Sequence, residues 1–258
     1  YNFYLLIFIL ISIYIYIFYY YIKKFHSYFL LYFFFSGASL LLLERGNNDL
    51  IVFVILFFSL NTHNIFFSYI FYLIRIILKI FPLFGLLGYL SKFKNIKIII
   101  LFILPVVFYF IITYEDLAKI FYNTPRSGDM SFGSYAIEYN LFKHFKLKIN
   151  SVYISIVLIL FTFLAYFSIR KKFLVNLKFL EESSFLVGSC IYSCLFVISS
   201  SYDYRLVFLL FSIPCIIKLN SNIIKYTLLI SIAFSSELYR LLLIFGFYGG
   251  IVNSIFKL

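Results

Sequence analysis

The sequence predicts an all-α integral membrane protein, a polytopic bundle of about eight to ten transmembrane helices in a single domain. Two observations predict this class. The 258 residues are 64% hydrophobic and only 12% charged, whereas soluble domains are about 45–50% apolar and about 25% charged. The lysines fall in short clusters between apolar runs, as expected for loops that stay on the cytoplasmic side. A secreted enzyme, a disordered tail and a soluble nucleic-acid binder are therefore excluded.

The net charge of +12 and the aromatic content need no nucleic-acid partner. An AT-rich genome favours codons for Phe and Tyr, which number 37 and 25, and disfavours Trp, which is absent. We therefore expect a multi-pass protein of a bacterial inner membrane, in contact with membrane lipids. The chain begins at Tyr1 and its single methionine is Met130, so we expect a fragment that lacks its N-terminal part.

The first half of the chain contains four apolar runs. Lysine clusters follow the first and the last of these runs, and we expect both clusters to lie in the cytoplasm. An even number of crossings must then separate them. Either the short run Leu50–Leu60 only dips into the membrane, or the long run that follows breaks near Lys79–Pro82. We favour the break, because proline removes a helical hydrogen bond. The four runs are Phe3–Ile22, Tyr28–Leu43, Leu50–Leu60 and Ile65–Leu90.

The second half alternates apolar runs with basic turns around a long outer loop, residues 114–150. Within that loop, Tyr135–Phe145 is expected to form an amphipathic helix on the membrane surface, with its aromatic side chains inward. An outer turn is expected between the last two runs, where Glu237 and Arg240 lie. The expected crossings are Ile98–Thr113, Ser151–Ile169, Phe185–Ser200, Leu206–Ile217, Ile223–Ser235 and Leu241–Phe256.

Polar residues that interrupt the apolar runs are expected to gather at the outer face. A charge at membrane depth costs about 2.5–3.5 kcal/mol on insertion, so such groups usually face a cavity or one another. The cations among them can form an outward pocket for a phosphate. Alternatively, Asp49–Arg205 or Asp203–Arg240 are ion pairs that only hold helices together. The full set is Glu44, Arg45, Asn47, Asp49, Lys79, Asp203, Arg205, Glu237 and Arg240.

The sequence contains no P-loop, nucleophile elbow, zinc-binding spacing or Asp-x-Asp pattern. We therefore expect neither a metal nor another cofactor. Cys190, Cys194 and Cys215 lie inside apolar runs and are interpreted as small packing residues.

Three short segments occur in an order that resembles a known family. They are Glu44–Asp49 (ERGNND), Lys79–Pro82 (KIFP) and Ser200–Val207 (SSYDYRLV). The order resembles the polyprenyl-phosphate-mannose-dependent mannosyltransferase-like family of the GT-C glycosyltransferases. In that family a Gly-Gln-x-Asn-like stretch, a Lys-x-x-Pro stretch and a Ser-Trp-Asp-His-like stretch follow one another. In that family the carboxylate that activates the acceptor lies upstream of these motifs. If this chain lacks its N-terminal part, that carboxylate lies outside this sequence.

The resemblance implies a GT-C-like bundle that transfers a sugar from a polyprenyl-phosphate donor to a glycan or lipid acceptor at the outer face, without a metal. It also implies roles for the candidate residues. The catalytic candidates are Asp49 and Asp203, which would contact acceptor or sugar hydroxyls. The substrate-binding candidates are Arg45, Lys79 and Arg205 at the phosphate, Asn47 as a hydrogen-bonding partner, and Glu44, Tyr202 and Arg240.

Other classes of membrane protein stay open at this point. A transporter or flippase for lipid-linked or anionic solutes would show polar groups accessible from both faces. A polysaccharide polymerase or an acyltransferase would carry paired arginines or a catalytic histidine in its outer loop. The loop here offers only Arg126 and His144. A structural membrane subunit would not explain charges gathered at one face.

Overall fold

The computed structural model describes residues 2–45, 48–62, 64–79, 81–86, 96–123, 131–169, 179–198 and 201–244. Within these ranges the fold is all-α, as the sequence predicted, apart from one pair of two-residue strands. In chain order the elements are α1 (Asn2–Phe25), α2 (Phe29–Phe34), α3 (Gly37–Arg45), α4 (Asn48–Asn61), α5 (Ile65–Leu78), the 3-10 helix η1 (Phe81–Gly85), α7 (Ile96–Asn123), β1 (Ser131–Phe132), α8 (Ser134–Phe145), α9 (Ser151–Ile169), α10 (Phe179–Ile198), β2 (Ser201–Tyr202), the 3-10 helix η2 (Asp203–Phe211), α11 (Ile213–Ile217) and α12 (Asn222–Ile244).

The centre of the fold is formed by α4, α10, η1 and η2. Helix α10 packs against both 3-10 helices, and α4 packs against α5. The ring of Phe53 in α4 lies 5.8 Å from that of Phe208 and 5.1 Å from that of Phe211, between centroids. Gly188 of α10 allows η2 to come close, since an ideal Cβ there would lie 2.9 Å from the Phe208 carbonyl oxygen. Aromatic packing therefore fixes the position of η2, which carries part of the third sequence motif.

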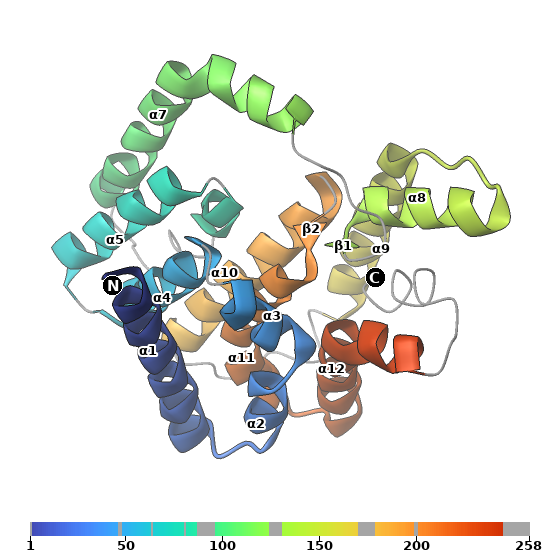
Figure 1. Ribbon diagram of the computed structural model, residues 1–258, viewed down its shortest axis with the longest axis horizontal. Coiled ribbons are helices and arrows are strands. Elements are labelled where there is room, and N and C mark those ends of the chain that lie inside the picture. Colours follow the sequence, from blue (N-terminus) through green and yellow to red (C-terminus); the bar gives the residue numbers. More distant parts are fainter. Residues whose placement is uncertain are drawn as a thin grey trace.

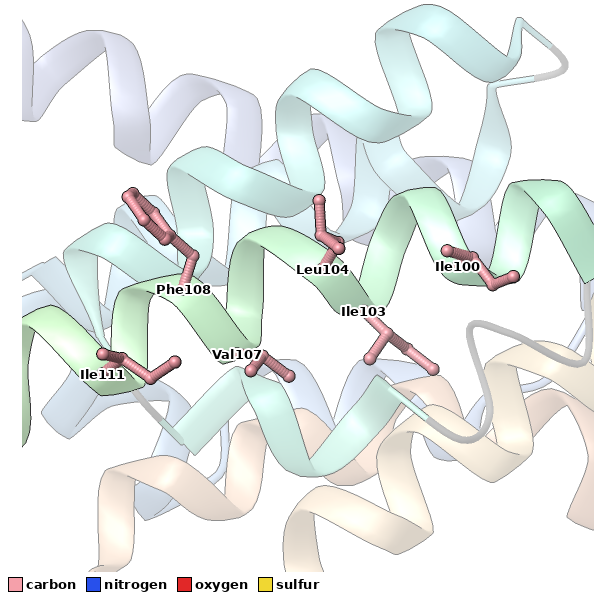
Figure 2. Close-up of a pocket in the computed structure, with 6 residues that line it drawn as sticks. All are labelled: Ile100, Ile103, Leu104, Val107, Phe108 and Ile111. Carbon is pink, nitrogen blue, oxygen red and sulfur yellow. The ribbon is translucent and has the colours of Figure 1, made fainter.

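Within the part of the chain that the structure describes, two helices are long and apolar enough to cross a membrane, over Tyr4–Phe25 of α1 and Lys97–Asp116 of α7. Helix α7 runs along one edge of the molecule (Figure 1). A shallow groove of about 430 Å³ follows it, and every side chain that lines the groove is apolar and comes from α7 (Figure 2). These side chains are Ile100, Ile103, Leu104, Val107, Phe108 and Ile111. Two such helices are weak evidence for a membrane by themselves, so the larger number of crossings stays a prediction.

The expectation of one continuous helix over Tyr28–Leu43 is wrong. The chain forms α2 and α3 instead, with a break at Phe35 and Ser36. Ser36 is buried, and its Oγ accepts a hydrogen bond from the Ser39 backbone N–H at 3.4 Å, while Ser39 Oγ donates to the Phe33 carbonyl at 2.8 Å. Serine side chains that bond to nearby backbone compete with helix continuation and favour a new helix start.

The expected break near Lys79–Pro82 is confirmed. Helix α5 ends at Leu78, Lys79 has an extended backbone, and η1 begins at Phe81. Pro82 has no N–H to donate to the Leu78 carbonyl, so α5 cannot continue through it as a regular α-helix. The preceding run, expected at Leu50–Leu60, forms the 14-residue α4.

Two expectations for the C-terminal half are also wrong. The run Leu206–Ile217 does not form one α-helix but is divided between η2 and α11, with Pro214 in the first turn of α11. The expected outer turn at Glu237 and Arg240 is absent, because α12 continues through both residues to Ile244. The last expected run, Leu241–Phe256, lies mostly outside the described residues. By contrast, Ser151–Ile169 forms α9 with the predicted bounds.

The long loop expected at residues 114–150 contains more helix than its polar composition predicted. Helix α7 extends to Asn123, and α8 confirms the expected helix at Tyr135–Phe145. Ala136, Ile137 and Asn140 form its buried face, so Phe142 and Phe145 are exposed rather than packed on the protein. Its place on a membrane surface stays a prediction. Strand β1 pairs antiparallel with β2, Ser131 opposite Tyr202, and this pairing brings the loop beside the third motif.

Glu138 connects α8 to the start of α9. Its carboxylate accepts a hydrogen bond from the Ser151 backbone N–H at 2.8 Å, and Asn150 Oδ1 accepts from the Val152 N–H at 2.9 Å. Glu138→Ala is expected to lower the free energy of unfolding by about 1 kcal/mol, the usual effect of losing a helix cap. Thermal unfolding in detergent micelles measures this loss. A Glu138→Gln variant, which keeps one acceptor oxygen, should lose less, and equal losses for the two variants would contradict the capping role.

Candidate anion site

Asp49 anchors a cluster of three charged side chains that come from separate parts of the chain. It lies in the first turn of α4, where the N-terminal end of a helix stabilises a negative charge. Its side chain has no exposed surface. A buried carboxylate requires cationic partners or hydrogen bonds, and the next two segments bring two cations to it.

Lys79 approaches from the end of α5. Its backbone N–H donates to the Arg75 carbonyl at 3.0 Å, and its extended backbone ends the helix. The side chain then crosses to α4, where Nζ lies 3.8 Å from Asp49 Oδ2, and 33% of that side chain is exposed. The helix break therefore directs the lysine toward the carboxylate and leaves its side chain partly exposed.

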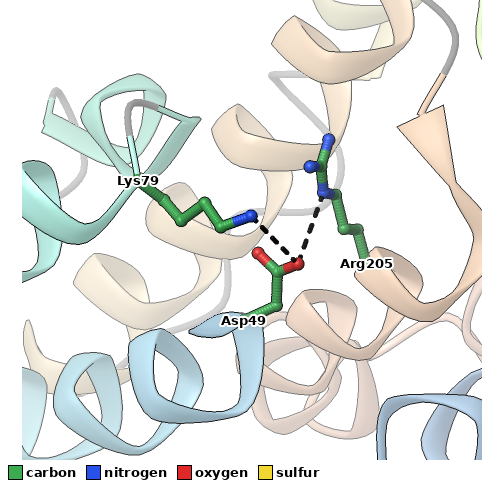
Figure 3. A network of polar contacts seen from close by, with 3 residues as sticks. All are labelled: Asp49, Lys79 and Arg205. Atoms are coloured by element: carbon green, nitrogen blue, oxygen red, sulfur yellow. Dashed lines mark ion pairs between the residues drawn. The ribbon is translucent and has the colours of Figure 1, made fainter. Parts of the chain in front are cut away.

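Arg205 approaches from η2. Its Nε lies 4.0 Å from the same oxygen, Asp49 Oδ2, and 19% of its side chain is exposed. The guanidinium carbon stands 4.9 Å from the ring centroid of Phe81, the first residue of η1. A cation over an aromatic face gains electrostatic stabilisation, so η1 helps to hold Arg205. Figure 3 shows the carboxylate between the two cations.

The three side chains together carry one negative and two positive charges. Their N–O distances, 3.8 and 4.0 Å, exceed the 2.7–2.9 Å or so of a charge-assisted hydrogen bond. The carboxylate therefore holds two cations near one of its oxygen atoms, and both cationic side chains stay partly exposed. An arrangement with excess positive charge and partial access is suited to a small anion such as a phosphate.

The other candidates are placed by their backbones. Glu44 is exposed in the last turn of α3, a helix that packs against η2. Arg45 is the last residue of α3, and Arg240 lies within α12. Tyr202 and Asp203 lie where β2 meets η2. The side chains of these four residues are outside the described part of the structure. Asn47 lies outside the described residues altogether. The structure therefore brings together one member of each motif, and the roles of the other candidates stay predictions.

Arg75 is a charged residue of α5 that the candidate set left out. Its side chain is fully buried, and its guanidinium carbon lies 4.8 Å from the Tyr72 ring centroid. Its backbone carbonyl accepts the hydrogen bond from the Lys79 N–H that closes the end of α5. A charged residue inside an apolar run was the signal available in the sequence.

Comparisons of the chain with protein-family models, with curated proteins and with solved structures find no match. The resemblance drawn from the three motifs accordingly stays a hypothesis. Among the described residues, no three His, Cys, Asp or Glu side chains are grouped in a way that could hold a metal ion. The chemistry open to the site therefore follows from the charges and distances of its three side chains.

Proposed function

We propose that this chain is a polytopic membrane glycosyltransferase of the GT-C type that transfers a sugar from a polyprenyl-phosphate donor at the outer face of a bacterial inner membrane. The observation that carries the proposal is the Asp49–Lys79–Arg205 cluster (Figure 3). Each residue comes from one of the three motifs on which the family resemblance depends. A phosphate that ends a long lipid is the anion best matched to an accessible cationic site within an apolar helical protein.

The exposed apolar surface supports the membrane setting. Helices α1 and α7 are each long enough to span, and α7 presents isoleucine, leucine and phenylalanine outward along its length (Figure 2). Contiguous apolar surface of this kind is expensive in water and favourable in lipid. The proposed donor would reach the cluster from within the bilayer.

In the proposed reaction an acceptor hydroxyl attacks the anomeric carbon of the sugar. A bond forms between that oxygen and the carbon, and the bond from the carbon to the phosphate oxygen breaks. The phosphate leaves with the electron pair, while a carboxylate base takes the hydroxyl proton. Lys79 and Arg205 stabilise the charge that grows on the leaving phosphate.

Asp49 takes a positioning role in this proposal. Its carboxylate has no exposed side-chain surface and lies between the two cations, so it orients them rather than contacting a hydroxyl. The other catalytic candidate, Asp203, begins η2 two residues before Arg205. It is the candidate that we assign to acceptor or sugar hydroxyls.

The test measures binding of a short-chain polyprenyl phosphate and of the corresponding neutral polyprenol to the protein in nanodiscs. We expect the phosphate form to bind about tenfold more tightly or better, which is about 1.4 kcal/mol. Lys79→Ala and Arg205→Ala are each expected to remove most of that difference, because each deletes one of two cations. Arg205→Lys should retain part of it, since the charge stays but the planar guanidinium is lost.

Lys143→Ala is the matched control, because Lys143 is an exposed lysine on α8. It should bind both lipids like the unaltered protein. Thermal unfolding of each variant checks that the fold is retained. Equal affinity for the two lipids, or full phosphate preference in Lys79→Ala and Arg205→Ala, would show that the cluster is only a set of ion pairs between helices.

A further inference from the structure

A polar pocket of about 620 Å³ lies at the end of α4 opposite to Asp49. It is formed where the last turns of α1 meet the end of α4 and the first turns of α5. At one end of the pocket, four of the lining residues are polar or charged. The other lining residues are aromatic. The lining residues are Tyr16, Tyr20, Lys24, Phe57, Phe58, Asn61, Thr62, Phe67 and Phe71.

The polar end is ordered by a chain of hydrogen bonds. Lys24 Nζ donates to Tyr20 Oη at 3.0 Å, Tyr20 Oη donates to Asn61 Oδ1 at 3.5 Å, and Asn61 Nδ2 donates to the Phe57 carbonyl at 2.9 Å. An ammonium has three N–H donors, so two on Lys24 are available to a ligand beside the one given to Tyr20. None of the residues that line the pocket is acidic. The pocket therefore presents a fixed, accessible positive charge without an internal counter-ion.

The remaining wall is apolar and open. Tyr16, Phe58 and Phe67 are exposed, and Phe58 lies 6.4 Å from Phe71, between ring centroids. One lysine beside four phenylalanines is a poor site for free phosphate, which needs several donors to replace its water. It is well matched to an amphiphile that places an anionic group on the lysine and a hydrocarbon chain along the aromatic wall.

We propose that this pocket binds an anionic phospholipid, with the headgroup phosphate on Lys24 and one acyl chain against Phe58, Phe67 and Phe71. The last turn of α1 also carries Lys23, and basic residues at a helix end attract anionic headgroups. Because α4 has 14 residues and rises about 1.5 Å per residue, the pocket and the Asp49 cluster are about 20 Å apart. The two sites are therefore separate, and the lipid site does not depend on the proposed transferase activity.

Native mass spectrometry of the full chain in detergent micelles tests the proposal, with dioleoyl phosphatidylglycerol compared with dioleoyl phosphatidylcholine. We expect phosphatidylglycerol to be retained about fivefold more than phosphatidylcholine, as expected for one lysine at a headgroup. Lys24→Ala should abolish the preference and Lys24→Arg should keep it. Asn61→Asp, which adds a negative charge with almost no change of shape, should also abolish it.

Lys143→Ala is again the matched control, because Lys143 Nζ also lies over an aromatic ring, 5.7 Å from the Tyr139 centroid. Lys143→Ala and Lys79→Ala should both leave the preference for phosphatidylglycerol unchanged. A failure of the proposed function and a failure of the lipid site are therefore distinguishable. Equal retention of the two lipids, or an unchanged preference in Lys24→Ala, overturns the proposal. Displacement of the lipid by millimolar glycerol phosphate would also overturn it, because the occupant would then be a soluble phosphate.

Discussion

Asp49→Ala is expected to lower the free energy of unfolding by about 3 kcal/mol, the lower end of the range for removing one partner of a buried ion pair. The substitution leaves Lys79 and Arg205 facing each other without the carboxylate that separates them. The loss stays at the lower end because a third of the Lys79 side chain is already exposed. Thermal or denaturant unfolding in detergent micelles measures the change.

A compensated variant shows whether the loss comes from the charges. Replacing all three residues together, Asp49→Leu, Lys79→Met and Arg205→Met, removes every charge of the cluster while keeping apolar volume. Buried charge clusters replaced in this way often regain or exceed the original stability. The triple variant should therefore be more stable than Asp49→Ala. If it is less stable, Asp49 contributes through its helix end or its packing and not through the two cations.

Gly188→Ala has the second large expected effect. An added Cβ would lie 2.6 Å from Ser212 Oγ, 2.9 Å from the Phe208 carbonyl oxygen and 3.1 Å from the Ser212 backbone nitrogen. Alanine favours a helix over glycine by about 1 kcal/mol, but the backbone of η2 and α11 cannot move aside without disturbing the core. We expect a net loss of about 1–3 kcal/mol, the range for overpacking. A shift of η2 would also move Arg205, so donor binding should weaken together with stability.

Gly85→Ala provides the comparison within the same core. Its added Cβ would meet Val187 Cγ1 at 3.1 Å and Ile191 Cδ1 at 3.3 Å, which are the ends of side chains that can adjust. The expected loss is therefore well below that of Gly188→Ala. Unfolding of the two variants side by side checks the order. A larger loss at Gly85 would mean that η1, rather than η2, is the element fixed most tightly against α10.

The fold could be predicted where one long apolar run has clear ends. Helix α9 is such a case, because Asn150 offers a helix cap and Arg170 follows the apolar run. Short apolar runs were harder. Leu206–Phe211 is apolar at every position, so it has no period that distinguishes an α-helix from a 3-10 helix. Its conformation depends on packing against Gly188 of α10, which is distant in sequence.

The candidate site was predictable to the extent that isolated charges in apolar surroundings must find partners. This argument identified Asp49, Lys79 and Arg205 before their distances were known. It also named the pair Asp49–Arg205, and Arg205 Nε does lie 4.0 Å from Asp49 Oδ2. It could not indicate that Lys79 would approach the same oxygen, since that depends on how α4, α5 and η2 meet. The pairing of β1 with β2, through Ser131 and Tyr202, has no strand-like sequence signal because each strand has only two residues.

The shortness of α4 has a consequence for the depth of the charged cluster. Its 14 residues cover about 21 Å, whereas the hydrocarbon part of a bilayer is about 30 Å thick. Under the two proposals above, with Lys24 at one membrane surface, Asp49 would lie about 9 Å short of the other surface unless the bilayer thins around it. The proposed donor phosphate would then have to sink below its usual level to meet Lys79 and Arg205. The two proposals together therefore predict that bilayer thickness affects donor binding, with tighter binding in thin membranes.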